Sequence, residues 1–216
     1  AFATAILIPT IGILDWTIKE LEDVDIKTRR ILCMTGNFHR KSDVNRLYVK
    51  RADGGRGLKR FEDCFKTRIV SIRRHLIRDH KRNHLLKNVL EHEEQRIMRI
   101  GEQYEKMYIE QESGDDVIRD EVISDKIKNE INKRDKDQWH TKPQHGYLFK
   151  KMKEKDSTEL KDSYLWIRKG KFTSHIEGYL FAVQEQDIET KALKKRREKD
   201  LNKKMSMDTK CRLCGQ

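Results

Sequence analysis

Two cysteines near the end of the sequence have the spacing of a metal site. Cys211 and Cys214 flank two residues and are followed by Gly215. Two thiolates at this spacing can bind one side of a tetrahedral zinc ion. A redox pair would instead precede a helix within an alternating strand–helix pattern, which the sequence does not show. We therefore expect an incomplete zinc site. His145 and His175 are conceivable further ligands, although nothing in the spacing favours them.

A glycine-rich turn surrounded by positive charge is the next candidate. The run Gly54–Gly57 contains three glycines and precedes an apolar-periodic segment that starts at Leu58. A helix that begins after such a turn presents free N–H groups to an anion such as phosphate. The cations that would assist are Arg56, Lys59 and Arg60. The alternative is an ordinary turn and helix cap with surface Arg and Lys, which the local sequence favours.

Two further groups of cations could follow nucleic-acid phosphates. One group lies opposite an apolar stripe, in a run from residue 66 to 88 that has Asp79 as its lone acid. The stripe consists of Phe61, Phe65, Ile69, Ile72 and Leu76. The opposite face carries Arg68, Arg73, Arg74 and Arg78, followed by Lys81, Arg82 and Lys87. The other group is the densest basic patch, Lys194, Lys195, Arg196 and Arg197. Such faces are usually just solvated, and short basic runs are only weak nuclear-localisation signals.

Two apparent catalytic motifs lack the setting that their chemistry requires. His80 and His84 are one helical turn apart, but a zinc protease needs His-Glu-x-x-His, and neighbouring cations oppose a metal. The run Gly114–Asp116 contains paired aspartates, which in polymerases hold two metals on a strand–turn–strand with apolar flanks. Here the flanks are charged and helical, so Ser113–Asp116 is better interpreted as a helix start. We expect no polymerase chemistry within this chain.

The composition favours slender helices and a polyanionic partner. Of the 216 residues, 36% are hydrophobic and 39% are charged, with a net charge of +12. Nucleic acid is the commonest partner of such a basic chain, and an anionic membrane surface is the rival. No segment reaches the roughly 18–20 apolar residues that span a bilayer, so we expect no membrane. Cys33 and Cys64 are interpreted as buried free thiols in a reducing, intracellular compartment.

The apolar spacing predicts a mainly α-helical chain with little or no sheet. Capping boxes at Thr17–Glu20 and Ser174–Glu177 mark two helix starts. A polar helix over 117–138 is expected to be anchored by Ile118, Val122, Ile127 and Ile131. A later helix, capped by Ser157 and ending at Gly170, is expected to pair with a helix carrying Ile176, Leu180, Val183 and Ile188. The predicted parts are helices with a glycine-rich turn (1–60), a long basic then acidic helical segment (61–138), a hinge loop (139–146), a helical hairpin with a basic tail (147–205), and the start of a zinc knuckle (206–216).

The order of several short motifs resembles non-LTR retrotransposon reverse transcriptases. His39–Val49 and Gly54–Leu58 look like the region just after the polymerase core. Trp166–Gly170 and Cys211–Gly215 are similar to later landmarks, in the same order. The resemblance runs over nearly the whole chain and implies a fragment of such a protein. Its first part would be the thumb, a helical bundle that grips the template–primer duplex, and a downstream His and Cys would complete the zinc knuckle.

The resemblance implies a nucleic-acid-binding fragment of an RNA-directed DNA polymerase that lacks the polymerase active site. Its partners would be RNA, DNA and the rest of the polyprotein, in the nucleus when part of the full protein. Phosphate neutralisation by Arg and Lys on helix faces would be the mechanism. The alternative is a basic helical scaffold or protein-interaction module whose charge only maintains solubility.

Overall fold

A computed structural model describes residues 8–11, 13–108, 120–154 and 160–188 of the chain. This part of the chain folds into helices and turns without a strand, apart from one bridge between Ile11 and Leu14. The mainly α-helical prediction is therefore confirmed. The elements in order are η1 (Ile8–Thr10), α2 (Ile18–Met34), α3 (Val44–Tyr48), η2 (Arg51–Asp53), α4 (Phe61–Asp79), α5 (His84–Tyr108), α6 (Asp120–Thr141), α7 (Tyr147–Glu154), α8 (Leu160–Ser163), α9 (Leu165–Lys169) and α10 (Ser174–Gln184).

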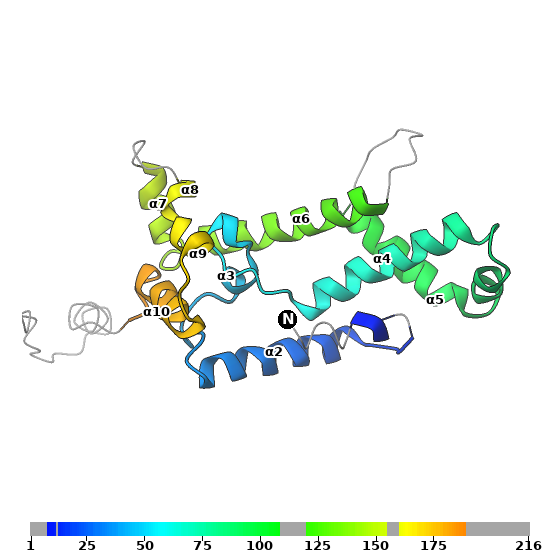
Figure 1. Cartoon of the computed structure of the whole chain (residues 1–216), viewed down its shortest axis with the longest axis horizontal. Coiled ribbons are helices and arrows are strands. Elements are labelled where there is room, and N and C mark those ends of the chain that lie inside the picture. The colour runs from blue at the N-terminus through cyan, green and yellow to red at the C-terminus, as the bar shows by residue number, and fades with distance from the viewer. Residues whose placement is uncertain (1–7, 12, 109–119, 155–159, 189–216) are drawn as a thin grey trace, which may run out of the picture.

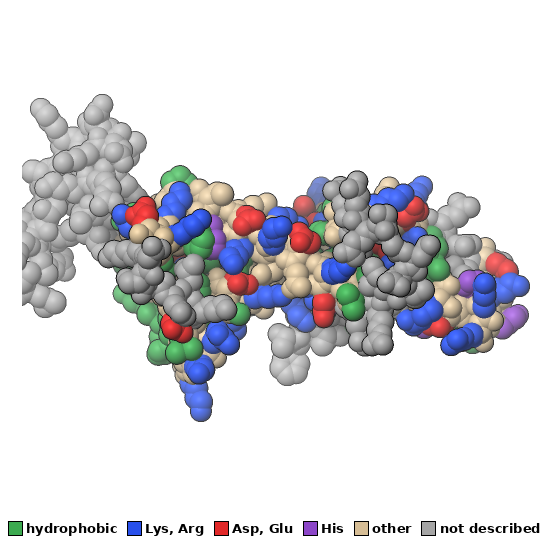
Figure 2. All heavy atoms as spheres, turned by 90° about the horizontal axis from the view of Figure 1, so that it is seen from above, with side chains coloured by type: hydrophobic (Ala, Val, Ile, Leu, Met, Phe, Trp, Pro, Cys, Tyr) green, Lys and Arg blue, Asp and Glu red, His purple; other side chains and the backbone are tan. Residues whose placement is uncertain are grey.

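The helices form an elongated molecule with α4 along its middle (Figure 1). α4 and α5 are joined by a short turn and lie antiparallel at one end, while α2 and α6 lie on either side of α4. The short helices α7 to α10 gather with α3 at the other end. Seen from above, Lys and Arg side chains alternate with Asp and Glu over this face (Figure 2). The visible surface of the described residues thus carries charges of both signs on that face.

α4 has two buried faces, and both are needed to form the core. Phe61, Phe65 and Ile69 pack against Leu21 of α2 in one cluster. Val70 packs in another cluster with Ile123, Ile127 and Ile131 of α6. The predicted stripe on α4 is buried at all its positions except Ile72, which is half-buried. The stripe missed Val70, because α6 covers a second side of the helix.

The apolar register of α6 differs from the prediction by one residue at its start. Val122 is 45% exposed, whereas Ile123 is buried together with Ile127 and Ile131. Spacing of four residues places these three isoleucines on one side of the helix, facing α4. Two adjacent β-branched residues at 122 and 123 made the choice ambiguous in the sequence. Ile118 lies outside the described residues.

The predicted hinge starts too early, because α6 continues through Trp139 and His140 to Thr141. Trp139 is buried, and its indole N–H donates to the backbone oxygen of His145 at 3.2 Å. That packing keeps the tryptophan in the helix. The chain turns only afterwards, closed by a hydrogen bond from Gly146 N–H to the oxygen of Lys142.

Some predicted helix ends also need correction. The capping box at Thr17 is confirmed, with both of its hydrogen bonds to Glu20 present. The second box is wrong, because Thr173 caps α10 and Ser174 is its first helical residue. α10 ends at Gln184, since Gln186 takes a positive φ of 57°, so Ile188 lies beyond the helix. Within the described part of the predicted helix that ends at Gly170, α8 and α9 are separate elements, with a break at Tyr164.

α9 and α10 do meet, as the predicted pairing of these segments requires. The rings of Trp166 and Phe181 lie 5.5 Å apart between centroids, and Ile167 is buried in the same cluster. Ser113–Asp116, Ser157 and the tail from 189 onward lie outside the described residues. The division of the chain into five parts therefore stays a prediction.

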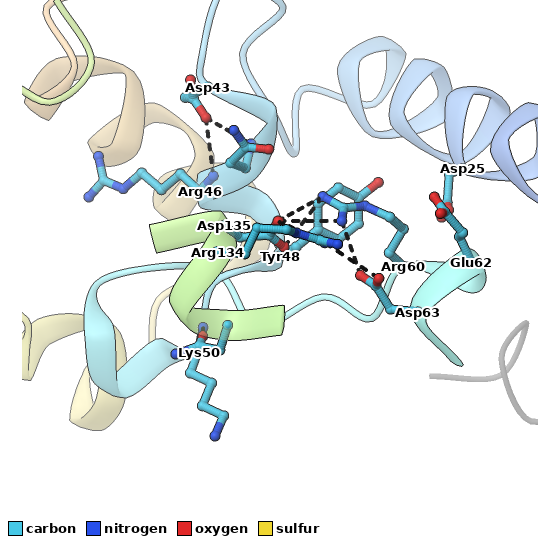
Figure 3. Close-up of polar contacts among 12 residues, drawn as sticks. Asp25, Asp43, Arg46, Tyr48, Lys50, Arg60, Glu62, Asp63, Arg134 and Asp135 are labelled. Carbon is cyan, nitrogen blue, oxygen red and sulfur yellow. Dashed lines mark hydrogen bonds and ion pairs between the residues drawn. The ribbon is translucent and has the colours of Figure 1, made fainter. Parts of the chain in front are cut away.

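A carboxylate from α2 caps the start of α4, where Asp25 lies beside Glu62 of the first turn (Figure 3). Arg60, the residue before α4, forms no side-chain cap. Instead, the N–H of Phe61 donates to both carboxylate oxygens of Asp25 at 3.1 Å. Burial raises the pKa of Asp25 to about 6, while hydrogen bonds from the backbone of Phe61 and Glu62 oppose that rise. An anion is stabilising at a helix N-terminus, and here the protein supplies its own.

Asp25→Ala should lower the free energy of unfolding by about 1–2 kcal/mol, because it removes the cap and leaves the N–H of Phe61 buried and unpaired. Asp25→Asn should lower it less, since the amide oxygen can still accept one hydrogen bond. Urea denaturation measures both. Asp23→Ala, an exposed change on the same helix, is the matched control. Equal stability of the Asp25→Ala and Asp23→Ala variants would show that the cap contributes nothing.

The cleft between α4 and α6 as a candidate nucleic-acid interface

The glycine-rich turn folds back onto α3 and uses its own N–H groups. Gly54 and Gly57 take left-handed φ values of 88° and 74°, which glycine adopts without strain. The N–H groups of residues 55 to 58 donate to backbone oxygens of residues 46 to 50, at 2.8 to 3.1 Å. These amides are therefore not free for a phosphate. At this position the geometry agrees with the turn-and-cap alternative.

Arg56, one of the predicted phosphate ligands, is a buried link between the turn and its neighbours. Its guanidinium donates to the backbone oxygen of Asn37 and to that of Ser174. Burial lowers the pKa of Arg56. Arg56 is only 8% exposed, and its hydrogen bonds hold the turn against the start of α10.

Arg60 belongs to a four-residue ion network that joins α4 to α6 (Figure 3). It contacts Asp63 at 3.0 Å and Asp135 at 3.4 Å. Arg134 contacts the same two carboxylates, at 3.4 Å to Asp63 and 3.0 Å to Asp135. The guanidinium carbon of Arg60 also lies 4.3 Å from the ring centroid of Tyr48. We refer to Arg60, Asp63, Arg134 and Asp135 as the α4–α6 network.

A cleft of about 370 Å³ opens beside this network, between α4 and α6. Tyr48, Leu58 and Ile131 contribute its apolar lining. Ser71 and Ser124 contribute hydroxyl groups from the two facing helices. The cleft is thus an apolar space with a few polar groups, the general character of ligand-binding sites.

Besides Arg60, four cations line the same cleft: Lys50, Lys59, Arg68 and Lys128. Lys59 and Arg68 are exposed, and neither has an ion-pair partner among the residues that the structure describes. Lys50 donates to the side-chain oxygen of Asn129 at 2.6 Å, and exposed Lys128 contacts Asp125 at 2.9 Å. Lys59 and Arg68, which were predicted from the sequence, therefore lie at the same cleft as Lys50 and Lys128, which were not. Lys50 and Lys128 carry no local signal, because tertiary packing alone brings them to this cleft.

The remaining predicted arginines of α4 have partners on the protein. Arg73 and Arg74 both contact Glu105 of α5, the latter through its Nε at 2.8 Å. Arg78 contacts Asp79 at 2.8 Å. Phosphate binding by these arginines stays a prediction, and two of them already tie α4 to α5. Lys194–Arg197, Cys211 and Cys214 lie outside the described residues.

A second polar cluster surrounds His145, in the turn between α6 and α7. Its Nε2 lies 3.0 Å from the backbone oxygen of Lys41 and 3.6 Å from Asp187, and its Nδ1 lies 3.9 Å from Asp43. The contact with the Asp187 carboxylate raises the pKa of His145 to about 9, against the effect of burial. His145 is therefore a cation at neutral pH and joins segments that are far apart in the sequence.

This His145 cluster is where the described residues could hold a metal ion. Ligand atoms of His145, Glu185 and Asp187 lie within 4.8 Å of one another. However, Arg46 contacts Glu185 at 3.3 Å, and Lys142 contacts the adjacent Asp43. Cations that already neutralise the carboxylates oppose a divalent ion, so the cluster is best interpreted as an ion-pair network. His145, a conceivable zinc ligand in the sequence, belongs to this cluster, whereas Cys211 and Cys214 lie outside the described residues.

Comparisons with known proteins do not assign this chain to a family: no family model, curated protein or solved structure matches it. In the described part of the chain, no helix is long and apolar enough to cross a bilayer.

The pKa of His145 predicts a pH-dependent contribution to stability. Because the pKa rises from about 6.5 in the unfolded chain to about 9 in the folded one, the contribution is complete below the lower value. It is lost as the pH rises through the higher value. The stability difference between wild type and His145→Gln should therefore shrink from about pH 7 to about pH 10.

Urea denaturation at several pH values measures this difference. Comparing variant with wild type at each pH removes the contributions that both chains share, and the remaining difference includes the effect of His145 on Glu185, whose pKa it lowers. His84→Gln, at the exposed start of α5, is the control for replacing a histidine by glutamine. A difference for His145→Gln that stays constant from pH 7 to pH 10 would contradict the account.

Proposed function

We propose that this chain is a nucleic-acid-binding part of a non-LTR retrotransposon reverse transcriptase, with the polymerase active site outside it. Two independent lines support the proposal: the order of the motifs in the sequence, and the cations around the cleft between α4 and α6. The observation that carries the binding function is the presence of Lys59 and Arg68 at this cleft without ion-pair partners among the described residues.

The charge at the cleft is positive because its acids are already neutralised. Asp63 and Asp135 are the carboxylates in its lining, and both contact Arg60 and Arg134. The amino and guanidinium groups of Lys59 and Arg68 add charge that no ion-pair partner in the described ranges compensates. Phosphates brought to these groups release condensed counterions, which is the main source of affinity in such interfaces.

Other basic groups of the described chain are less suited to this role. Arg56 is buried, and Arg73 and Arg74 share Glu105. Replacing these residues would disturb helix packing as well as charge, so a loss of binding would have two explanations. Lys59 and Arg68 are exposed and form no ion pair between helices within the described part of the chain, which makes them the appropriate residues to test.

The proposal includes the other expectations from the resemblance. RNA, DNA and the rest of the polyprotein would be its partners, and the full protein would act in the nucleus. Cys211 and Cys214 would supply half of a zinc knuckle, and Lys194–Arg197 would hold a second stretch of nucleic acid. The chain itself would perform no polymerase reaction. If the basic charge merely maintains solubility, the chain is instead a scaffold or protein-interaction module.

The double variant Lys59→Glu/Arg68→Glu should bind RNA and RNA–DNA hybrid about tenfold more weakly at moderate salt. The slope of log affinity against log salt should become shallower by roughly 1.4–1.8, since each lost phosphate contact removes about 0.7–0.9. Different sequences should be affected equally, because phosphates carry no sequence information directly. Fluorescence anisotropy with labelled oligonucleotides over a salt series measures both quantities.

Lys27→Glu/Arg30→Glu is the matched control, because both residues are exposed on α2 and the change in net charge is the same. The control should retain the slope and most of the affinity. Equal losses in the two double variants would mean that binding follows net charge alone. Unchanged binding in the cleft variant would favour the scaffold alternative.

A further inference from the structure

The cleft between α4 and α6 is a concave space, which a duplex backbone does not fill. Its volume of about 370 Å³ lies in the range of small-molecule sites, roughly 300–1,000 Å³. In a duplex the bases are stacked inside, so the phosphates and groove edges meet a protein surface. An unstacked base of a single strand, in contrast, can enter an apolar pocket. The shape therefore points to a single strand.

Arg60 gives the cleft a planar group that is held in place before any ligand binds. Its guanidinium is fixed from three sides by Asp63, Asp135 and the ring of Tyr48. Guanidinium planes are surfaces on which unpaired bases stack. Because the ion contacts already orient Arg60, a base stacking on it loses little conformational entropy of the side chain.

The polar groups in the lining offer little means of distinguishing bases. The hydroxyls of Thr67 and Ser71 donate to backbone oxygens of their own helix, at 2.8 and 3.0 Å. The side chain of Asn132 accepts from the N–H of Lys50 and donates to Asp53, both at 2.8 Å. The amide that could read a base edge is thus engaged within the protein. Binding through stacking and phosphates tolerates any base.

Both sides of the cleft carry cations. Arg68 belongs to α4 and Lys59 to the segment that leads into it, whereas Lys128 belongs to α6 on the other side. A strand that crosses the cleft would bring the phosphates on either side of an inserted base to these groups.

We propose that a single-stranded nucleic-acid segment crosses this cleft, with one base inserted between α4 and α6 and stacked on Arg60. The flanking phosphates contact Lys59, Arg68 and Lys128. This inference rests on the proposed nucleic-acid binding at the same cleft and names the form of nucleic acid that the cleft takes.

Filling the cleft without changing its charge tests the inference. Ser71→Phe and Ser124→Phe each place a ring in the space from one of the two helices. Each should weaken binding of a single-stranded oligonucleotide by about fivefold or more, since stacking of one base contributes about 1–3 kcal/mol. Binding of a duplex of the same sequence should not change. Thr141→Phe, exposed at the end of α6, is the control.

A single strand carrying 2-aminopurine supplies a second readout. Its fluorescence reports stacking of the base and should change on binding to the wild-type chain and to Thr141→Phe. The change should be absent with the filled variants. Circular dichroism identifies a variant that fails to fold, and the test then relies on the other filled variant. If both fail to fold, an unlabelled duplex is used to compete with a labelled single strand for the wild-type chain. We expect the chain to prefer the single strand.

The results separate this inference from the proposed function. The filled variants could bind single strands as the wild type does while Lys59→Glu/Arg68→Glu binds weakly. In that case the proposed insertion of a base is wrong, and the proposed nucleic-acid binding is retained. Equal affinity of the wild type for single strand and duplex would also overturn the inference. If neither the filled variants nor the charge variant binds more weakly, both proposals fall.

Discussion

The ion network of Arg60, Asp63, Arg134 and Asp135 is the interaction on which the arrangement of α4 and α6 depends. Charges that leave water are costly unless they are paired, and here each carboxylate contacts both guanidinium groups. Sliding either helix along the other would separate these pairs and leave charge partly buried. The network therefore fixes the register of the two helices, and with it the walls of the cleft.

The start of α4 is constrained from a second direction by Asp25. This buried carboxylate holds the first turn of α4 against α2, while Arg60, one residue before the helix, reaches toward α6. α4 is thus tied at one end to both α2 and α6. Lys59 and Arg68 extend from this same rigid region, so their charges converge on the cleft without a loop having to move. A preorganised surface of this kind loses less entropy when a ligand binds.

Apolar spacing and capping patterns predicted most of the helices, because they report local requirements of the backbone. The stripe on α4 and the box at Thr17 are examples. The errors lie where packing decides between equal local choices, as with Val122 and Ile123, or extends a helix beyond its expected end, as at Trp139. The candidate site could be predicted only in part. A sequence shows that Arg73 and Lys59 are both cations. It does not show that Glu105 neutralises Arg73.

The phosphate site expected after the glycine turn shows the same limit. The sequence correctly indicated a turn followed by a helix N-terminus. It could not reveal that Asp25 of α2 occupies the place where an external anion would bind. Lys50 and Lys128 were missed for the opposite reason, because they look like ordinary surface lysines until α6 folds back beside α4. Partners that are distant in the sequence decide which charges remain available.

Photo-cross-linking of the full chain to a uniformly labelled single-stranded RNA, followed by mass spectrometry of the peptides, tests the central claim most directly. The account predicts cross-links in peptides from both walls of the cleft, around residues 58–71 and 124–132. Additional cross-links near Lys194–Arg197 are compatible with it. Cross-links confined to α2, α10 or the tail, with none in either wall of the cleft, would contradict it.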